Sequence, residues 1–125
     1  MIPRFAGDFA DLVHRAASGG SGLDSKFVDD ACVTVALASE GYPESPRTGD
    51  VIGGLDHDAV KSVTVFHAGT KREGNELLTA GGRVLYVSAL GATISEARQR
   101  AYEAAAQIEW PGVYYRRDIA AGARP

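Results

Sequence analysis

Two short segments carry the residues best suited to holding a ligand. His67 ends an alternating apolar stretch, and Gly69 follows where a backbone without a side chain can approach a ligand closely. Further on, Gly81 and Gly82 expose backbone N–H groups beside Arg83, whose planar guanidinium suits a phosphate. Taken alone, each segment favours an ordinary structural role. These roles are a strand-end histidine bonded to its own turn and a glycine hairpin followed by a surface arginine.

The other reactive side chains also favour structural roles. Cys32 lies within an apolar stretch, where burial keeps a thiol protonated and inert. The three histidines are far apart and share no metal-ligand spacing, and no hydrolase, metalloprotease or phosphate-loop motif occurs. Arg116 and Arg117 are typical of a solvated end or an ion pair with a neighbouring domain. The sequence therefore predicts no catalytic residue and no metal ligand in this chain.

Length and charge limit the classes of protein that the chain can belong to. It has 125 residues, enough for one domain, and a net charge of -3. Nucleic acid and anionic membranes need a basic face, so neither is expected as a partner. The longest apolar run, 31–38, is too short to span a bilayer, and residues 1–10 lack a secretory signal pattern. A single cysteine points to the reducing cytoplasm.

The first half of the chain predicts a short helix and then a strand. The helix runs from Pro3 to about Ala17 with Asp8 as its cap, and a flexible loop, 18–22, follows it. Residues 1–22 are too few to fold alone, so we expect this helix and loop to belong to the same domain as the rest of the chain. The run 31–38 is apolar at nearly every position, which predicts a strand buried on both faces.

The second half predicts an antiparallel meander and a long helix. Alternation over 63–67 indicates a strand, the charged segment 71–76 a hairpin turn, and 83–89 a further strand. Thr93 and Glu96 form a capping box that opens the helix. Its predicted buried stripe ends before Trp110, Pro111 and Gly112 and consists of Ile94, Ala97, Ala101, Ala104, Ala105 and Ile108. The fold class is therefore α+β: a small, mainly antiparallel sheet with one long and one short helix.

The order of several motifs resembles a known family. They are Gly41-Tyr42-Pro43, Gly49-Asp50-Val51-Ile52, Gly54-Leu55, Val65 to Thr70, Gly81 to Leu85, Ala89-Leu90-Gly91, Glu96-Ala97-Arg98, Ala101-Tyr102 and Tyr115 to Ile119. In this order they resemble the C-terminal domain of the phosphoribosylamine–glycine ligases, which are ATP-grasp enzymes. The resemblance covers about 32–119. It divides the chain into an N-terminal helix and connector from the ATP-grasp core, 1–31, and the C-terminal domain, 32–125.

The resemblance implies a fold and a reaction. The fold is the antiparallel C-terminal module shared with biotin carboxylase, a rudiment single hybrid motif. The complete enzyme joins phosphoribosylamine and glycine in purine biosynthesis, using ATP and magnesium (manganese is possible), through an acyl phosphate of glycine. The partners are then the ATP-grasp and N-terminal portions of the same enzyme. This chain alone is expected to be inactive and to bind no cofactor, because it lacks the ATP-grasp core.

The resemblance also implies binding residues. Related ATP-grasp purine enzymes place an arginine at the position of Arg83 against the substrate 5-phosphate, with Gly82, His67 and the Gly69 backbone lining the same pocket. Arg4, within a partly matching family motif, would face the reacting phosphates. The metal-ligating Asn of that motif is Ile2 here, which has no side-chain donor atom.

Three interpretations of the chain remain open. It is an excised C-terminal part of the ligase, a subunit of a split enzyme, or a free-standing phosphoribosyl-binding or structural module. The first is favoured, because the motifs are well kept. A domain that docks on a larger core should also expose an apolar face when isolated, and the candidates for it are Tyr42, Phe66, Tyr114 and Tyr115.

Overall fold

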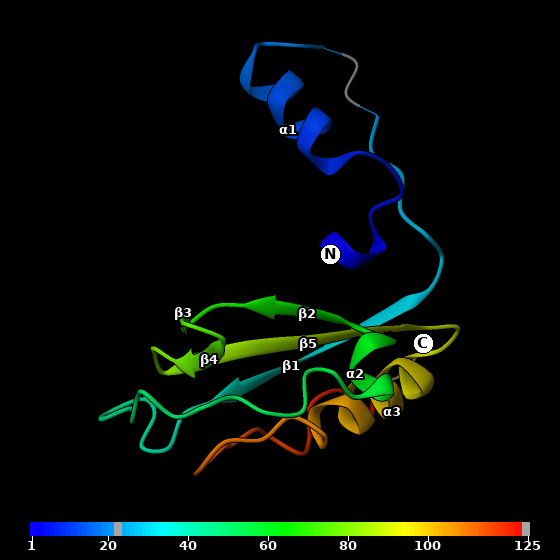
Figure 1. Cartoon of the computed structure of the whole chain (residues 1–125). Coiled ribbons are helices and arrows are strands. Elements are labelled where there is room, and N and C mark those ends of the chain that lie inside the picture. The colour runs from blue at the N-terminus through cyan, green and yellow to red at the C-terminus, as the bar shows by residue number, and fades with distance from the viewer. Residues whose placement is uncertain (22–23, 124–125) are drawn as a thin grey trace.

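A three-stranded antiparallel sheet with one long helix against it forms the body of the molecule (Figure 1). The computed structural model describes residues 1–21 and 24–123. Its elements in chain order are η1 (Ile2–Arg4), α1 (Phe9–Ala17), β1 (Ala31–Ala38), α2 (Asp58–Lys61), β2 (Thr64–His67), β3 (Thr70–Glu73), β4 (Glu76–Thr79), β5 (Arg83–Gly91) and α3 (Ile94–Ala105). The predicted α+β class, with a mainly antiparallel sheet, is confirmed.

The strands pair in the order β1-β5-β2, so the last strand lies between the first two. Strands β3 and β4 form a separate hairpin, and β4 is also bridged on its other side by the segment 49–52, through Val51 and Leu78. The prediction of a charged turn over 71–76 was therefore wrong in extent. Strand β3 continues to Glu73, and the turn itself is Gly74-Asn75, where Gly74 has a φ of 58° that suits a two-residue hairpin.

Helix α3 supplies one side of the core. The alanines of its predicted stripe, Ala97, Ala101, Ala104 and Ala105, are fully buried against β1 and β5. Half of the predicted capping box is confirmed, because the Glu96 amide donates to Thr93 Oγ1 (3.1 Å). The Glu96 carboxylate accepts from the Ala92 amide (2.9 Å), one residue before the predicted Thr93 amide. The helix ends at Ala105, five residues before the predicted stop at Trp110. Ile108, the last residue of the predicted stripe, is therefore buried beyond the end of the helix.

Strand β1 corrects another expectation. Its side chains alternate, so Val33, Val35 and Leu37 are buried on the side of α3, while Thr34 is exposed and Ala36 half-buried on the outer face. The apolar composition predicted burial on both faces, but α3 covers only one. On the outer face the Thr34 and Ser88 hydroxyls hydrogen-bond at 2.7 Å across β1 and β5.

Within the N-terminal arm, residues 1–21 and 24–30, helix α1 stands apart from the sheet (Figure 1), whereas η1 contacts β1 and β5. The predicted helix from Pro3 to Ala17 is two elements, because Pro3 lies in the 3-10 turn η1 and α1 begins only at Phe9. Asp8 caps α1 as predicted, accepting from the Asp11 amide at 2.9 Å. Helix α1 buries no residue. The predicted loop 18–22 ends at Gly22, which lies outside the described residues.

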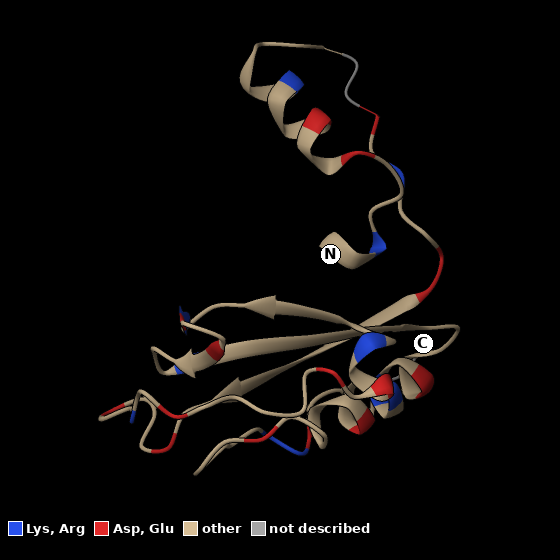
Figure 2. Cartoon of the chain, viewed as in Figure 1, with Lys and Arg blue, Asp and Glu red and all other residues tan. Residues whose placement is uncertain are grey.

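Charged residues lie mainly on helices, loops, the arm and the β3–β4 hairpin (Figure 2). The three strands of the main sheet, which are described in full, hold one charged residue between them: Arg83, at the start of β5. Among the described residues, every helix is too short or too polar to cross a bilayer.

Candidate functional site

A β-bulge sets the direction of Arg83. Leu37 pairs with Leu85, but the next residue of β1, Ala38, pairs with Arg83, so the register shifts by one residue at this point. Without the shift, Arg83 would share the helix-covered face with Leu85, because side chains alternate along a strand. With the shift it lies on the outer face beside Ala36 and Ala38. The bulge therefore turns the one charged side chain of the sheet away from the core.

Arg83 faces a small pocket, called the Arg83 pocket below, at this end of the sheet. Its volume is about 180 Å³. Its walls are almost entirely apolar and aromatic, and they are formed by Ala36, Ala38, Tyr42, Arg83, Tyr114, Tyr115, Arg116 and Ile119. The pocket brings together parts of the chain that are widely separated in sequence. This arrangement offers an apolar wall to an organic ligand, and two exposed arginines belong to the residues that form it.

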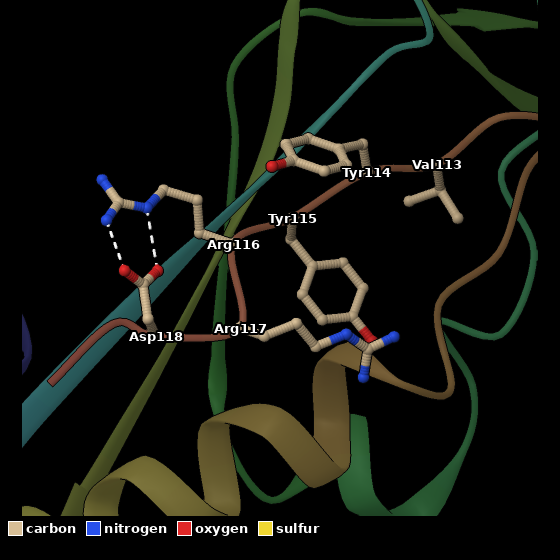
Figure 3. Close-up of a pocket in the computed structure, with 6 residues that line it drawn as sticks. All are labelled: Val113, Tyr114, Tyr115, Arg116, Arg117 and Asp118. Carbon is tan, nitrogen blue, oxygen red and sulfur yellow. Dashed lines mark hydrogen bonds and ion pairs between the residues drawn. The ribbon is translucent and has the colours of Figure 1, made fainter. Parts of the chain in front are cut away.

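The guanidinium groups of Arg83 and Arg116 differ in their pairing. Arg116 donates two parallel hydrogen bonds to Asp118, at 2.9 and 2.6 Å (Figure 3). This fork raises the pKa of Arg116 and lowers the pKa of the Asp118 carboxyl. Arg83 is exposed, and within residues 1–21 and 24–123 its guanidinium has no ion-pair partner. Arg83 is thus the guanidinium left available for an anion.

The glycines before Arg83 do not leave open space. A Cβ on Gly82 would lie 2.8 Å from Cε2 of Tyr42, so the Tyr42 ring fills the room that the sequence suggested for a ligand. The carbonyls of Gly81 and Gly82 accept hydrogen bonds from the side chain and backbone of Ser39, both at 2.9 Å. Gly82 therefore supports the pocket from behind and does not line it.

His67 and Gly69 are close to Arg83 in the sheet but outside its pocket. His67 Nδ1 lies 3.2 Å from Thr70 Oγ1, the bond to its own turn that its local sequence favoured. The Gly69 amide donates to the Arg83 carbonyl at 2.9 Å, and a Cβ on Gly69 would lie 2.8 Å from Gly81 Cα. The close approach that glycine permits here is thus made by the chain itself.

Arg4 lies in a different place. Its guanidinium donates to the Val28 carbonyl, at 3.3 Å from Nε and 3.0 Å from Nη2, and lines a depression near Thr93. Thr93 follows the end of β5, whereas Arg83 begins that strand, and a nine-residue strand spans roughly 30 Å. The structure brings Gly69, Gly82 and Arg83 together and leaves Arg4 at the opposite end of the sheet.

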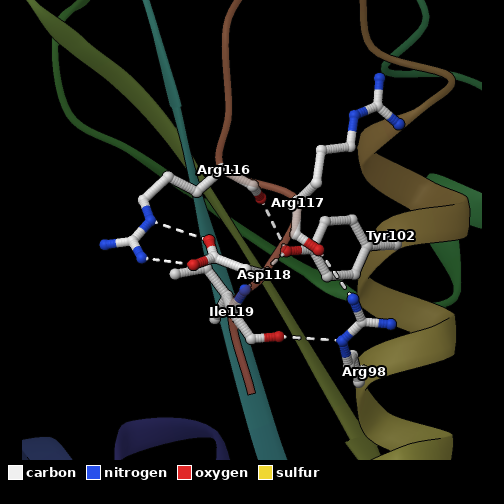
Figure 4. A network of polar contacts seen from close by, with 6 residues as sticks. All are labelled: Arg98, Tyr102, Arg116, Arg117, Asp118 and Ile119. Carbon is white, nitrogen blue, oxygen red and sulfur yellow. Dashed lines mark hydrogen bonds and ion pairs between the residues drawn. The ribbon is translucent and has the colours of Figure 1, made fainter. Parts of the chain in front are cut away.

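A polar network that sequence reasoning missed holds the segment carrying Arg116 (Figure 4). Arg98 of α3 donates to the Ile119 carbonyl (2.9 Å) and the Arg117 carbonyl (2.7 Å). The Tyr102 hydroxyl donates to the Arg116 carbonyl at 2.6 Å and accepts from the Ile119 amide at 3.1 Å. The spacing of Arg98 and Tyr102, four apart on one helix face, was the available signal.

The predicted docking aromatics divide between two places. Tyr42 and Tyr114 are 43% and 62% exposed and line the Arg83 pocket together with Tyr115. Phe66 lines a separate depression on the outer sheet face, beside Tyr86 and the first residues of the arm. Three of the four candidates therefore share the pocket with Arg83.

Comparison with known proteins gives the class of domain. Residues 32–122 match the family described as "Phosphoribosylglycinamide synthetase, C domain". The chain is 46% identical over 128 aligned positions to the phosphoribosylamine–glycine ligase of Streptomyces coelicolor, covering 98% of this chain and 31% of that protein. The ligase of Leifsonia xyli is 49% identical over the same length, with the same coverage.

A solved structure agrees with the sequence comparisons. The crystal structure of phosphoribosylamine–glycine ligase from Thermotoga maritima superimposes with a TM-score of 0.75 at 35% identity, covering 90% of this chain and 27% of that one. The chain belongs to the family of phosphoribosylglycinamide synthetase C domains. It spans less than a third of the length of each of these ligases.

Proposed function

We propose that the chain acts as the C domain of an ATP-dependent phosphoribosylamine–glycine ligase and closes the substrate site against an ATP-grasp core. The observation that carries the proposal is the match to ligases of that name along nearly the whole chain. ATP, magnesium or manganese, phosphoribosylamine and glycine are then ligands of the complete enzyme. Its other portions are the partners of this domain. The cytoplasm is the expected compartment, because the single cysteine needs no oxidising environment.

Within that role, Arg83 anchors the phosphate of phosphoribosylamine. Three features support the assignment: the bulge directs Arg83 to the outer face, its guanidinium is exposed, and the Tyr42 and Tyr114 rings give the pocket an apolar wall. A guanidinium can hold two phosphate oxygens at once. His67, Gly69 and Gly82 support this site as neighbours of Arg83 in the sheet. Arg4 belongs to another surface, which would face the core.

The residues of this chain do not fit a magnesium site. Among the described residues, no three His, Cys, Asp or Glu side chains gather in a cluster that could hold a metal. Magnesium requires several oxygen ligands, and Ile2 offers none. The proposed role of the chain therefore does not pass through the metal or the nucleotide.

Reconstitution tests the proposed function. ATP, magnesium, glycine and phosphoribosylamine are supplied to this chain alone and to its mixture with a purified ATP-grasp fragment of the same enzyme. We expect ADP release only in the mixture. If the chain is folded and no ADP is released either by the chain alone or by the mixture, the proposal is contradicted and a free-standing binding or structural module is favoured.

Substitution of Arg83 tests the phosphate assignment. In a complete ligase carrying this domain, Arg83→Ala should cost roughly 1.5–3 kcal/mol of binding, or about ten- to a hundredfold in the KM for phosphoribosylamine. Arg72→Ala is the matched control, because Arg72 is also exposed at a strand but lies on the separate β3–β4 hairpin. An unchanged KM in the Arg83 variant would overturn the assignment.

A further inference from the structure

Ser39, the residue directly after β1, contacts both glycines that precede Arg83. It is 2% exposed. Its amide donates to the Gly82 carbonyl and its hydroxyl to the Gly81 carbonyl, both at 2.9 Å. One buried residue thus holds two consecutive peptide groups, the first through its side chain and the second through its backbone amide.

These two peptide groups need an external constraint. Consecutive glycines have wide backbone freedom, so neither Gly81 nor Gly82 limits the direction of the chain entering β5. The Tyr42 ring adds a second constraint by lying against Gly82, and the Tyr42 amide in turn donates to the Ser39 carbonyl at 3.3 Å. The turn from Ser39 to Tyr42 therefore packs as one unit on the glycines.

The bonds from Ser39 to the two glycines lie next to the register shift that sets the direction of Arg83. Ala38 is the residue of β1 at the register shift, and Ser39 is the next one along the chain. The Ser39 amide continues the strand pairing past the bulge, and its hydroxyl adds a bond that a regular ladder does not contain. Loss of that hydroxyl frees the Gly81 carbonyl two residues before Arg83.

We propose that Ser39 is a positioning residue for the anion site, acting on Arg83 through the Gly81 and Gly82 carbonyls. The proposal rests on the proposed function of Arg83. A nucleophilic role for Ser39 does not fit, because its hydroxyl is buried and its proton is donated to a carbonyl. The role of Ser39 is to hold the backbone, and the chemistry of binding belongs to Arg83.

A double-mutant cycle in a complete ligase carrying this domain tests the proposal. Ser39→Ala removes one hydrogen bond and should raise the KM for phosphoribosylamine roughly three- to tenfold, with a smaller effect on kcat. In an Arg83→Ala background the same substitution should leave the KM unchanged, because the group that it positions is gone. Ser88→Ala is the matched control: Ser88 is also buried and its hydroxyl bonds to Thr34 on the sheet, away from the pocket.

Each outcome decides between roles. A Ser39→Ala effect that persists unchanged in the Arg83→Ala background, or that Ser88→Ala matches, would indicate general destabilisation and overturn the proposal. An unchanged KM in Ser39→Ala, with Arg83→Ala impaired, would overturn it while leaving the proposed function intact. An unchanged KM in Arg83→Ala would overturn both the phosphate assignment of Arg83 and the positioning role of Ser39. If Ser39→Ala does not fold, Ser39→Cys supports the same comparison, because it replaces the hydroxyl with a weaker S–H donor in a slightly larger side chain.

Discussion

At the scale of single residues, Gly82 shows how a glycine can serve packing where the sequence suggests ligand binding. Gly82→Ala would place a Cβ within 2.8 Å of Tyr42 Cε2, so we expect a loss of about 1–3 kcal/mol in the free energy of unfolding. Denaturant unfolding measures it. In a Tyr42→Ala background, which removes the ring, the cost of Gly82→Ala should largely disappear. An equal cost in both backgrounds would show that the ring is not the cause.

The fork between Arg116 and Asp118 gives a prediction about pH. The hydrogen bonds from Arg116 lower the pKa of the Asp118 carboxyl, and this effect outweighs the loss of hydration, which acts in the opposite direction. A lowered carboxyl pKa stabilises the fold above its unfolded value of about 3.9, and this contribution is lost as the pH falls through the lowered value. Because both side chains are exposed, the contribution to stability is small.

A carboxyl titration by NMR measures this directly. Asp118 should titrate below the ordinary range for aspartate, and Arg116→Gln should raise its midpoint toward about 3.9. The matched control is Arg117→Gln, because the Arg117 guanidinium lies over the Tyr115 ring at 4.9 Å and not on Asp118. A midpoint that does not move in Arg116→Gln would contradict the fork as its cause.

At the scale of elements, Tyr102 attaches the segment 116–119 to α3. Tyr102→Phe removes the hydroxyl that contacts both Arg116 and Ile119 and should cost about 1–2 kcal/mol in the free energy of unfolding. Tyr114→Phe, a change of the same chemistry at a ring that is 62% exposed, should cost little. Urea unfolding of the two variants compares them. Equal stability would mean that the two bonds to Tyr102 contribute nothing net.

The elements also show what sequence could predict here. The capping box at Thr93 and the alanine stripe of α3 depend on residues a few positions apart, so local spacing was sufficient. The position of β5 between β1 and β2 depends on pairings across more than 40 residues of sequence, as between Leu37 and Leu85, and local alternation predicts strands but not their order.

The site follows the same division. Arg83 could be predicted as a binding residue by resemblance, because the Gly-Gly-Arg motif is local. The register shift that turns Arg83 outward, and the Ser39 contacts behind it, have no local signature. Sequence reasoning therefore proposed Arg83, whose binding role stays a prediction, and missed Ser39, which bonds to the two glycines before it.

At the scale of the whole molecule, the arm and the body are built differently. The body has its own core between α3 and the sheet, in which Leu37, Leu85 and Val87 are fully buried. The arm instead forms a small aromatic cluster, with the Phe5 ring edge-on to Phe9 and Phe27 at 5.4 and 5.8 Å. The arm meets the sheet chiefly at its first residues, beside Phe66 and Tyr86. The division of the chain near residue 31 stays a prediction. It can be tested by removing the arm, because the arm has few contacts with the body.

A shortened chain of residues 31–125 should therefore keep the stability of the body. Neither α1 nor η1 contains a buried residue, although η1 contacts β1 and β5, so we expect the loss of 1–30 to change the free energy of unfolding by less than about 1 kcal/mol. Leu85→Ala in the full chain gives the scale, since truncating a fully buried leucine typically costs about 2–5 kcal/mol. Thermal and urea unfolding compare the three proteins. A shortened chain as unstable as the Leu85 variant would show that arm and body form one cooperative unit. A shortened chain that unfolds with the full one would place the stability of this C domain entirely in its helix-covered sheet.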